Sequence, residues 1–159
     1  MAAVSKVYIT RERLAEIEEE LRDLKINARK EIAGKIAEAR AQGDLSENAE
    51  YDAAREEQGL LELRIHKIEH MLIRTEIIDE STIPTDKVGM LSKVKVRDKK
   101  TGKENLYQLV SQEDADFEGG KISVSSPIGR SLYNKTPGEA VNIKVPAGTI
   151  ELEIISITK

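Results

Sequence analysis

The stretch GDLSENAEYD, residues 43–52, separates two long segments that both have the apolar spacing of amphipathic helices. It carries four carboxylates and no basic residue. Glycine adopts the left-handed conformation after a helix without a Cβ clash, so Gly43 is predicted to end the first helix. If the second helix folds back on the first, the carboxylates lie at the end of a helical hairpin, where they can reach into another molecule.

The segment before this stretch predicts a helix with a buried seam. Its apolar residues recur in steps of three and four, as in a coiled coil. They are Leu14, Ile17, Leu21, Leu24, Ala28, Ile32, Ile36 and Ala39. The consecutive steps of four resemble a stutter, which locally unwinds a supercoil. Thr10 is a candidate N-cap for this helix.

The segment after the stretch predicts a second helix, for which Asp44 or Ser46 is a candidate N-cap. Its apolar face consists of Ala54, Leu61, Ile65, Ile68 and Leu72. Each helix has about thirty residues and is therefore about 45 Å long. Similar lengths and a short turn favour an antiparallel pair. We therefore assign residues 1–79 to an N-terminal coiled-coil hairpin whose acidic tip is residues 43–52.

After Ile77 the spacing changes to that of β-strands. Residues 80–86 contain Ser, Thr and Pro and predict a linker, and residues 87–159 then alternate apolar with polar positions. The predicted strands centre on Val94 and Val96, residues 106–110, Ile122 and Val124, residues 141–145 and residues 150–154, with turns at residues 98–102 and 146–149. Residues 127–134 predict a short helix that begins at Pro127. The fold class is therefore α+β, a long antiparallel α-helical hairpin followed by a small antiparallel β domain of four or five strands with a short helix.

The composition excludes several classes of protein. The net charge of the 159 residues is −4, which argues against a general nucleic-acid binder. The absence of cysteine excludes disulfides and thiolate metal sites. No apolar run approaches the ~20 residues that span a bilayer, and the N-terminus lacks a secretory apolar region. We expect a cytoplasmic protein with no membrane partner.

Asp44 and Glu47 are the candidate metal-binding and catalytic pair of the tip. They are three residues apart, so they share one face if helix begins near Asp44, and carboxylates are the hard oxygen ligands that Mg²⁺ prefers. Two carboxylates can also position or deprotonate a water. They are too few for a tight autonomous metal site, so water, phosphate or another protein would supply the remaining ligands. The alternative role is helix capping, in which each acid contributes ~0.3–1 kcal/mol through the helix dipole.

Basic residues lie a little behind the tip, at Arg29, Lys30, Lys35, Arg40 and Arg55. Arg40 and Arg55 are at similar distances from the turn, on facing sides of the predicted hairpin. Such a collar could hold a nucleic-acid backbone while the acids face a phosphate. The alternative is a solvated surface with salt bridges to Glu31 and Glu38.

Residues 39–56, ARAQGDLSENAEYDAARE, resemble the tip signature of the bacterial transcript-cleavage elongation factors of the GreA/GreB family. Residues 126–133, SPIGRSLY, followed by residues 137–139 and 145–148, resemble the same family. The similarity covers nearly the whole chain, and the tip motif is long and specific. It implies that the hairpin enters the secondary channel of bacterial RNA polymerase, and that the C-terminal domain has an FKBP-like fold and docks at the channel entrance.

The resemblance also implies a function and roles for the site residues. The factor would stimulate the polymerase's own Mg²⁺-dependent hydrolysis of the RNA 3′ end that backtracking extrudes. Asp44 and Glu47 would help hold the second Mg²⁺ of the polymerase active site and the attacking water, while Ser46 would contact or orient that site. Arg40 and Arg55 match the basic patch that touches the extruded RNA. The expected protein is thus a monomeric accessory factor, not an enzyme, with no cofactor of its own.

Four other functions are compatible with parts of this sequence. A paralogue that occupies the same channel and inhibits transcription would share both domains but have a different tip, so the intact motif DLSE, residues 44–47, argues against it. A prolyl isomerase needs an aromatic-lined pocket, and the C-terminal half offers only Tyr107, Phe117 and Tyr133. A purely structural adaptor would not require the tip carboxylates. A self-sufficient metal nuclease would cut RNA without polymerase.

Overall fold

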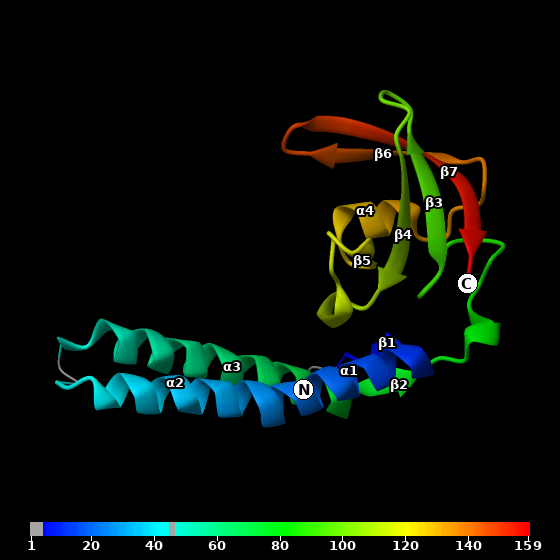
Figure 1. Cartoon of the computed structure of the whole chain (residues 1–159). Helices are drawn as coiled ribbons and strands as arrows, with labels where there is room; N and C mark the ends of the chain where they lie inside the picture. Colours follow the sequence, from blue (N-terminus) through cyan, green and yellow to red (C-terminus); the bar gives the residue numbers. More distant parts are fainter. Residues whose placement is uncertain (1–4, 45–46) are drawn as a thin grey trace. The chain divides into compact units, whose positions relative to one another are not determined.

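The computed structural model describes residues 5–44 and 47–159 and divides the chain into two compact units (Figure 1). The first unit is Glu12–Ile73, and the second combines the N-terminal residues as far as Arg11 with Arg74–Lys159. Among the described residues, no helix is both long and apolar enough to cross a membrane.

The first arm of the hairpin is one continuous helix with a π-helical insert. It consists of α1 (Arg11–Asp23), the π-helical stretch η1 (Leu24–Ala28) and α2 (Arg29–Ala41). The residues that flank η1 keep right-handed helical backbone angles, so the helix axis is not interrupted. A π turn closes i→i+5 hydrogen bonds and so accommodates an extra residue. The π-helical stretch lies at the start of the part of the seam in which apolar residues are four apart, from Leu24 to Ile36.

The second arm is α3 (Ala49–Ile73), and cross-helix ion pairs show that it runs antiparallel to the first. Lys25 pairs with Glu69, Arg29 with Glu62 and Lys35 with Glu57, so residue numbers rise on one arm as they fall on the other. The buried seam contains Ile17, Ile32, Ile36, Ala39, Ala54, Leu61, Ile65 and Ile68. These observations confirm the predicted hairpin and its seam. Near the end of α3, however, Met71 is buried and Leu72 is only partly buried.

Two short strands adjoin the arms of the hairpin but belong to the second unit. β1 (Val7–Ile9) and β2 (Thr75–Ile77) pair in parallel, and both Val7 and Ile9 are fully buried. The backbone N–H of Tyr8 donates to Ser111 Oγ at 2.9 Å, which ties β1 to the C-terminal residues. The structural boundaries therefore differ from the predicted division at residue 79. Each of these strands has only three residues, which is too short to show an apolar–polar alternation in the sequence. The whole hairpin also separates them in the sequence, so their pairing has no local signal.

The second unit is built on a five-stranded sheet with the strand order β5-β4-β3-β7-β6. Its elements are β3 (Lys93–Asp98), β4 (Glu104–Val110), β5 (Lys121–Ser123), α4 (Pro127–Leu132), β6 (Ala140–Val145) and β7 (Gly148–Thr158), with the short 3₁₀ helices η3 (Glu80–Thr82) and η4 (Gln112–Asp114). Every predicted strand and the short helix are present.

The prediction of a wholly antiparallel domain is wrong for one pair of strands, because β4 and β5 pair in parallel. Residues 111–120 carry the chain back through η4 and a turn before β5 begins, and parallel neighbours require such a crossover. All other pairs in this sheet are antiparallel.

The core of this unit lies between the sheet and α4, and α4 lies close to the backbone of β5. Leu132 of α4 is fully buried in the cluster that contains Val94, Leu109 and Ile154. Ser126 caps α4 by accepting from the Gly129 N–H at 3.1 Å. A Cβ on Gly129 would lie 2.0 Å from the Ser123 carbonyl oxygen, so only glycine fits. Residues 80–86, predicted as a linker, contain η3 and the buried Ile83, which packs in a second cluster of this unit.

Candidate functional site

The site begins where α2 ends. The N–H of Gln42 donates to the Ala39 carbonyl at 3.2 Å, and the N–H of Gly43 donates to the Arg40 carbonyl at 3.3 Å. Gly43 has a φ of +123°, a backbone conformation that side chains disfavour. These contacts satisfy carbonyls that a helix end leaves without partners. The predicted helix stop at Gly43 is thus confirmed.

Asn48 caps α3, and not Asp44 as predicted; the other predicted cap, Ser46, is outside the described residues. Its Oδ1 accepts from the N–H of Tyr51 at 3.1 Å, and its Nδ2 donates to the Ala39 carbonyl at 2.7 Å. The helix begins only at Ala49, later than expected, which moves the cap beyond the acidic pair. Asparagine is among the strongest N-cap residues, so its place directly before the helical run was the signal that could have identified it.

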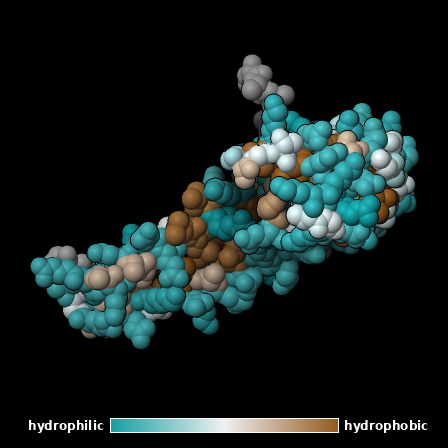
Figure 2. All heavy atoms as spheres, turned by 90° about the horizontal axis from the view of Figure 1, so that it is seen from above, coloured by the Kyte–Doolittle hydropathy of each residue, from teal (hydrophilic) through white to brown (hydrophobic). Residues whose placement is uncertain are grey.

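Asp44 and Glu47 lie exposed at the turn of the hairpin and line the same shallow surface pocket. The other lining residues are Gln42, Asn48, Ala49 and Glu50. The hairpin end that carries this turn is covered mostly by hydrophilic residues on the face shown in Figure 2. Within the part of the chain that the structure describes, no three acidic or histidine side chains converge to hold a metal ion. Ser46, the third predicted site residue of the tip, lies outside the described residues.

Two of the predicted collar cations are engaged in ion pairs across the hairpin. Arg29 makes two hydrogen bonds with Glu62, at 2.8 and 2.9 Å, and these bonds lower the pKa of the Glu62 carboxyl. Lys35 donates to Glu57 at 3.0 Å, which raises the pKa of the lysine. The partners are thus on the opposite arm, and not Glu31 and Glu38 as the salt-bridge alternative predicted. Both pairs are partly exposed, so each contributes modestly to stability.

Arg40 and Arg55 differ from these two cations because they have no ion pair among the residues that the structure describes. Both are exposed, Arg40 in the last turn of α2 and Arg55 in the second turn of α3. The guanidinium of Arg40 lies over the ring of Tyr51, 5.8 Å from its centroid. Sequence reasoning did not identify Tyr51 as part of the site. The cations that remain available for an anionic ligand therefore include the two nearest the acidic turn.

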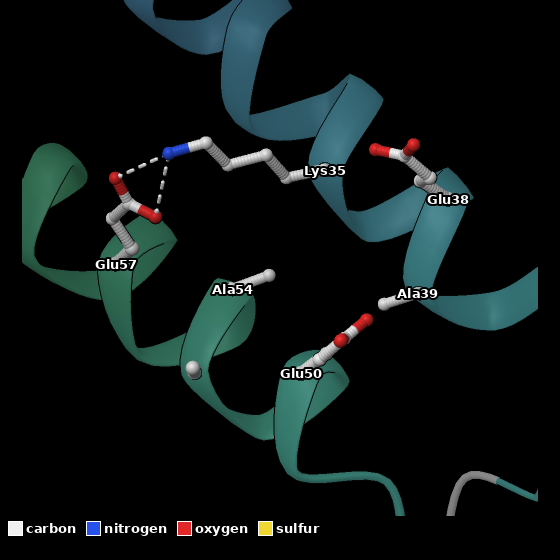
Figure 3. A pocket seen from close by; sticks show the side chains of 7 residues that line it. Lys35, Glu38, Ala39, Glu50, Ala54 and Glu57 are labelled. Carbon is white, nitrogen blue, oxygen red and sulfur yellow. Dashed lines mark hydrogen bonds and ion pairs between the residues drawn. The ribbon is translucent and has the colours of Figure 1, made fainter. Parts of the chain in front are cut away.

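A groove between the two arms lies directly behind the turn (Figure 3). Its lining consists of Lys35, Glu38, Ala39, Glu50, Ala53, Ala54 and Glu57. The small side chains of Ala39 and Ala54 are buried and allow the helices to approach closely. Figure 3 shows Glu50 pointing across the groove toward α2, while the Lys35–Glu57 pair bridges the arms. Glu50 also lines the pocket at the turn, so the groove and that pocket share this carboxylate.

Comparison with known proteins finds chains that are similar to this one along nearly its whole length. A solved structure of GreA factor homolog 1 of Thermus thermophilus is 24% identical, covers 98% of this chain and 100% of its own, and has a TM-score of 0.46. Transcription elongation factor GreA of Chlorobium phaeobacteroides is 52% identical over 153 residues, which are 96% of each chain. That of Flavobacterium johnsoniae is 48% identical over 157 residues, which are 98% of this chain and 99% of the relative.

The family models cover both parts of the chain. Residues 7–77 match the model described as transcription elongation factor, N-terminal, and residues 83–159 match the model described as transcription elongation factor, GreA/GreB, C-term. The chain therefore belongs to the GreA/GreB family of transcription elongation factors.

Proposed function

We propose that this elongation factor inserts its hairpin into the secondary channel of bacterial RNA polymerase and stimulates cleavage of the RNA 3′ end in backtracked complexes. The observation that carries this proposal is the exposed pair Asp44 and Glu47, which share one pocket at the turn of the hairpin. The cleavage itself is the polymerase's reaction, and the factor contributes side chains to it.

The acidic pair fits a magnesium ion that is held jointly with a partner. Both residues offer hard carboxylate oxygens, and the described residues around them provide no third acidic ligand in metal-binding geometry. A second Mg²⁺ would neutralise charge on the scissile phosphate and lower the pKa of a bound water. Asp44 and Glu47 would hold that ion and orient the water, and Ser46 would contact the polymerase site. Both carboxylates are exposed to solvent, so a partner can reach them.

Arg40 and Arg55, which have no ion pair within the described part of the chain, fit the extruded RNA. Arg40 and Arg55 lie on opposite arms close to the acidic turn and present planar guanidinium groups that bind phosphate through two hydrogen bonds. They would hold the RNA backbone while the acids face the bond to be cut. The net charge of −4 keeps the rest of the molecule from binding nucleic acid nonspecifically.

A purified, stalled and backtracked polymerase complex with labelled RNA tests the proposal. Wild-type protein is expected to release short 3′ fragments in Mg²⁺. Asp44→Asn and Glu47→Gln are expected to reduce cleavage by about 10²-fold or more, the cost typical of losing one transition-state-stabilising group. Binding to polymerase should persist in both variants. Glu31→Gln removes an exposed carboxylate from α2 away from the turn and serves as the matched control.

Three outcomes would contradict the proposal. Fragment release by the protein without polymerase would identify an autonomous nuclease. Undiminished release by Asp44→Asn would remove the acidic pair from the mechanism. Slower elongation without any cleavage would instead identify a channel-binding inhibitor.

A further inference from the structure

Asn48 makes hydrogen bonds to both arms of the hairpin at the point where the acidic turn joins them. Its Nδ2 donates to the Ala39 carbonyl in the last turn of α2 at 2.7 Å, and its Oδ1 accepts from the N–H of Tyr51 in the first turn of α3 at 3.1 Å. Its own carbonyl accepts from the N–H of Asp52 at 3.1 Å. One half-buried amide side chain thus partners a terminal group of each helix.

The orientation of this amide follows from its partners. A backbone N–H can only donate and a backbone carbonyl can only accept, so Oδ1 must face Tyr51 and Nδ2 must face Ala39. Aspartate at this position would retain an oxygen for the cap on α3. Its second oxygen would face the Ala39 carbonyl, where two acceptors repel one another. The cap on α3 and the bond to α2 can therefore be separated by a nearly isosteric substitution.

We propose that Asn48 is the positioning residue of the tip, because its bond to α2 fixes the separation of the two helix ends that carry the acidic pair. This inference rests on the proposed function. Asp44 and Glu47 lie between Ala39 and Asn48 in the sequence, so the Asn48–Ala39 bond links the two helix ends that flank both carboxylates. Holding the two helix ends together in the folded protein lowers the ordering cost that arises when the carboxylates engage the polymerase site.

This role differs from that of an ordinary helix cap, because it concerns the position of the turn and not the stability of α3. A cap stabilises α3, and any substitution that keeps an acceptor at this position preserves that effect. The bond to Ala39 instead controls where the turn begins relative to α3. Misplacing a catalytic group by about 1 Å can cost about 10²-fold in rate. The consequence of losing the bond should therefore appear in cleavage more than in stability.

The decisive variant is Asn48→Asp, with Asn142→Asp as its control. Asn142 is exposed on β6, so the control makes the same chemical change outside the hairpin. At a saturating concentration of factor, Asn48→Asp should slow cleavage of backtracked RNA by roughly tenfold to a hundredfold. It should also raise the Mg²⁺ concentration required for half-maximal cleavage. Affinity for polymerase and the melting temperature of the hairpin should stay close to those of the wild type.

A second measurement on the full-length chain needs no polymerase. Backbone ¹⁵N order parameters of Gly43, Asp44 and Glu47 should fall in Asn48→Asp and stay at wild-type values in Asn142→Asp. Wild-type cleavage kinetics in Asn48→Asp, or unchanged order parameters at these three residues, would overturn the positioning role. If the wild type itself failed to stimulate cleavage while the order parameters fell as expected, the proposed function would fail and the closure of the turn by Asn48 would stand.

Discussion

The guanidinium of Arg40 lies over the ring of Tyr51, with its central carbon 5.8 Å from the ring centroid. Arg40 belongs to the last turn of α2 and Tyr51 to the first turn of α3, so this contact joins the two arms beside the acidic turn. Tyr51 also donates its backbone N–H to Asn48. Tyr51 therefore contacts Arg40, the cation that we assign to RNA, directly, and it is linked to the Ala39 carbonyl through the side chain of Asn48.

Replacing Tyr51 tests whether its ring orients Arg40. Tyr51→Phe keeps the aromatic face and should cleave at nearly the wild-type rate. Tyr51→Leu loses a cation–π contact of ~0.5–1 kcal/mol at an exposed site and should slow cleavage by roughly twofold to fivefold. The rates are measured on one backtracked complex at subsaturating factor. Equal rates for the two variants would show that the ring has no part in positioning Arg40.

Replacing Arg40 or Arg55 with alanine should weaken the hold on RNA. Each variant should lower cleavage and also make it less sensitive to salt, because each phosphate contact to a single strand contributes about 0.7 to the slope of log affinity against log salt. Arg22→Ala, which removes an exposed arginine of α1 paired with Glu19, is the control and should change neither quantity. A salt dependence identical to that of the wild type in Arg40→Ala would contradict the RNA contact.

The two glycines Gly129 and Gly34 should respond oppositely to substitution by alanine. At Gly129 a Cβ would lie 2.0 Å from the Ser123 carbonyl oxygen, so Gly129→Ala should destabilise the C-terminal unit by more than about 2 kcal/mol. At Gly34, inside α2, nothing lies within 4 Å of the added atom, and Gly34→Ala should stabilise the hairpin by up to about 1 kcal/mol. Denaturant unfolding of the full chain measures both changes. A stabilised Gly129→Ala would contradict the close approach of α4 to β5.

The Arg29–Glu62 pair predicts a pH dependence of hairpin stability. The hydrogen bond from Arg29 holds the pKa of Glu62 below its ordinary value of 4.5. A depressed carboxyl pKa stabilises the fold above the unfolded value, and this stabilisation is lost as pH falls through the folded pKa. Glu62→Gln should therefore melt at a lower temperature than the wild type at neutral pH, and the difference should shrink below pH 4.5.

Helical circular dichroism on heating measures this difference. Glu56→Gln is the control on the same helix, because Glu56 is exposed and has no ion pair within the described residues. A gap between wild type and Glu62→Gln that stayed constant as pH fell below 4.5 would rule out the contribution of this pair.

The parts of the fold that could be predicted from the sequence are those with repeated local patterns. The buried seam from Ile17 to Ile68 follows helical spacing over many turns, so the apolar residues of the buried face recur in a pattern that the sequence shows. Strands β3, β6 and β7 alternate apolar and polar residues because one face packs on the core. The reversal at Gly43 depends on a single residue type with a distinctive backbone preference.

The parts that could not be predicted depend on contacts between distant residues. β1 and β2 have three residues each and exist only because Val7 and Thr75 are brought together by the hairpin between them. The parallel direction of β5 depends on how η4 and the following turn return the chain. At the site, residue type and family resemblance predict the acidic pair and the two arginines, and their roles stay predictions. The bond from Asn48 to Ala39 could not be predicted, because it depends on where α3 begins.

We propose that Asp44 and Glu47 donate oxygens to a magnesium ion that the polymerase also holds. The most direct test is the Mg²⁺ titration of cleavage in one backtracked complex, carried out without factor, with wild type and with Asp44→Asn, each factor at a concentration that saturates polymerase. Wild type should lower the Mg²⁺ concentration required for half-maximal cleavage, and Asp44→Asn should return it to the value for polymerase alone. A titration curve for Asp44→Asn that coincides with that of the wild type would show that Asp44 does not help to hold the ion.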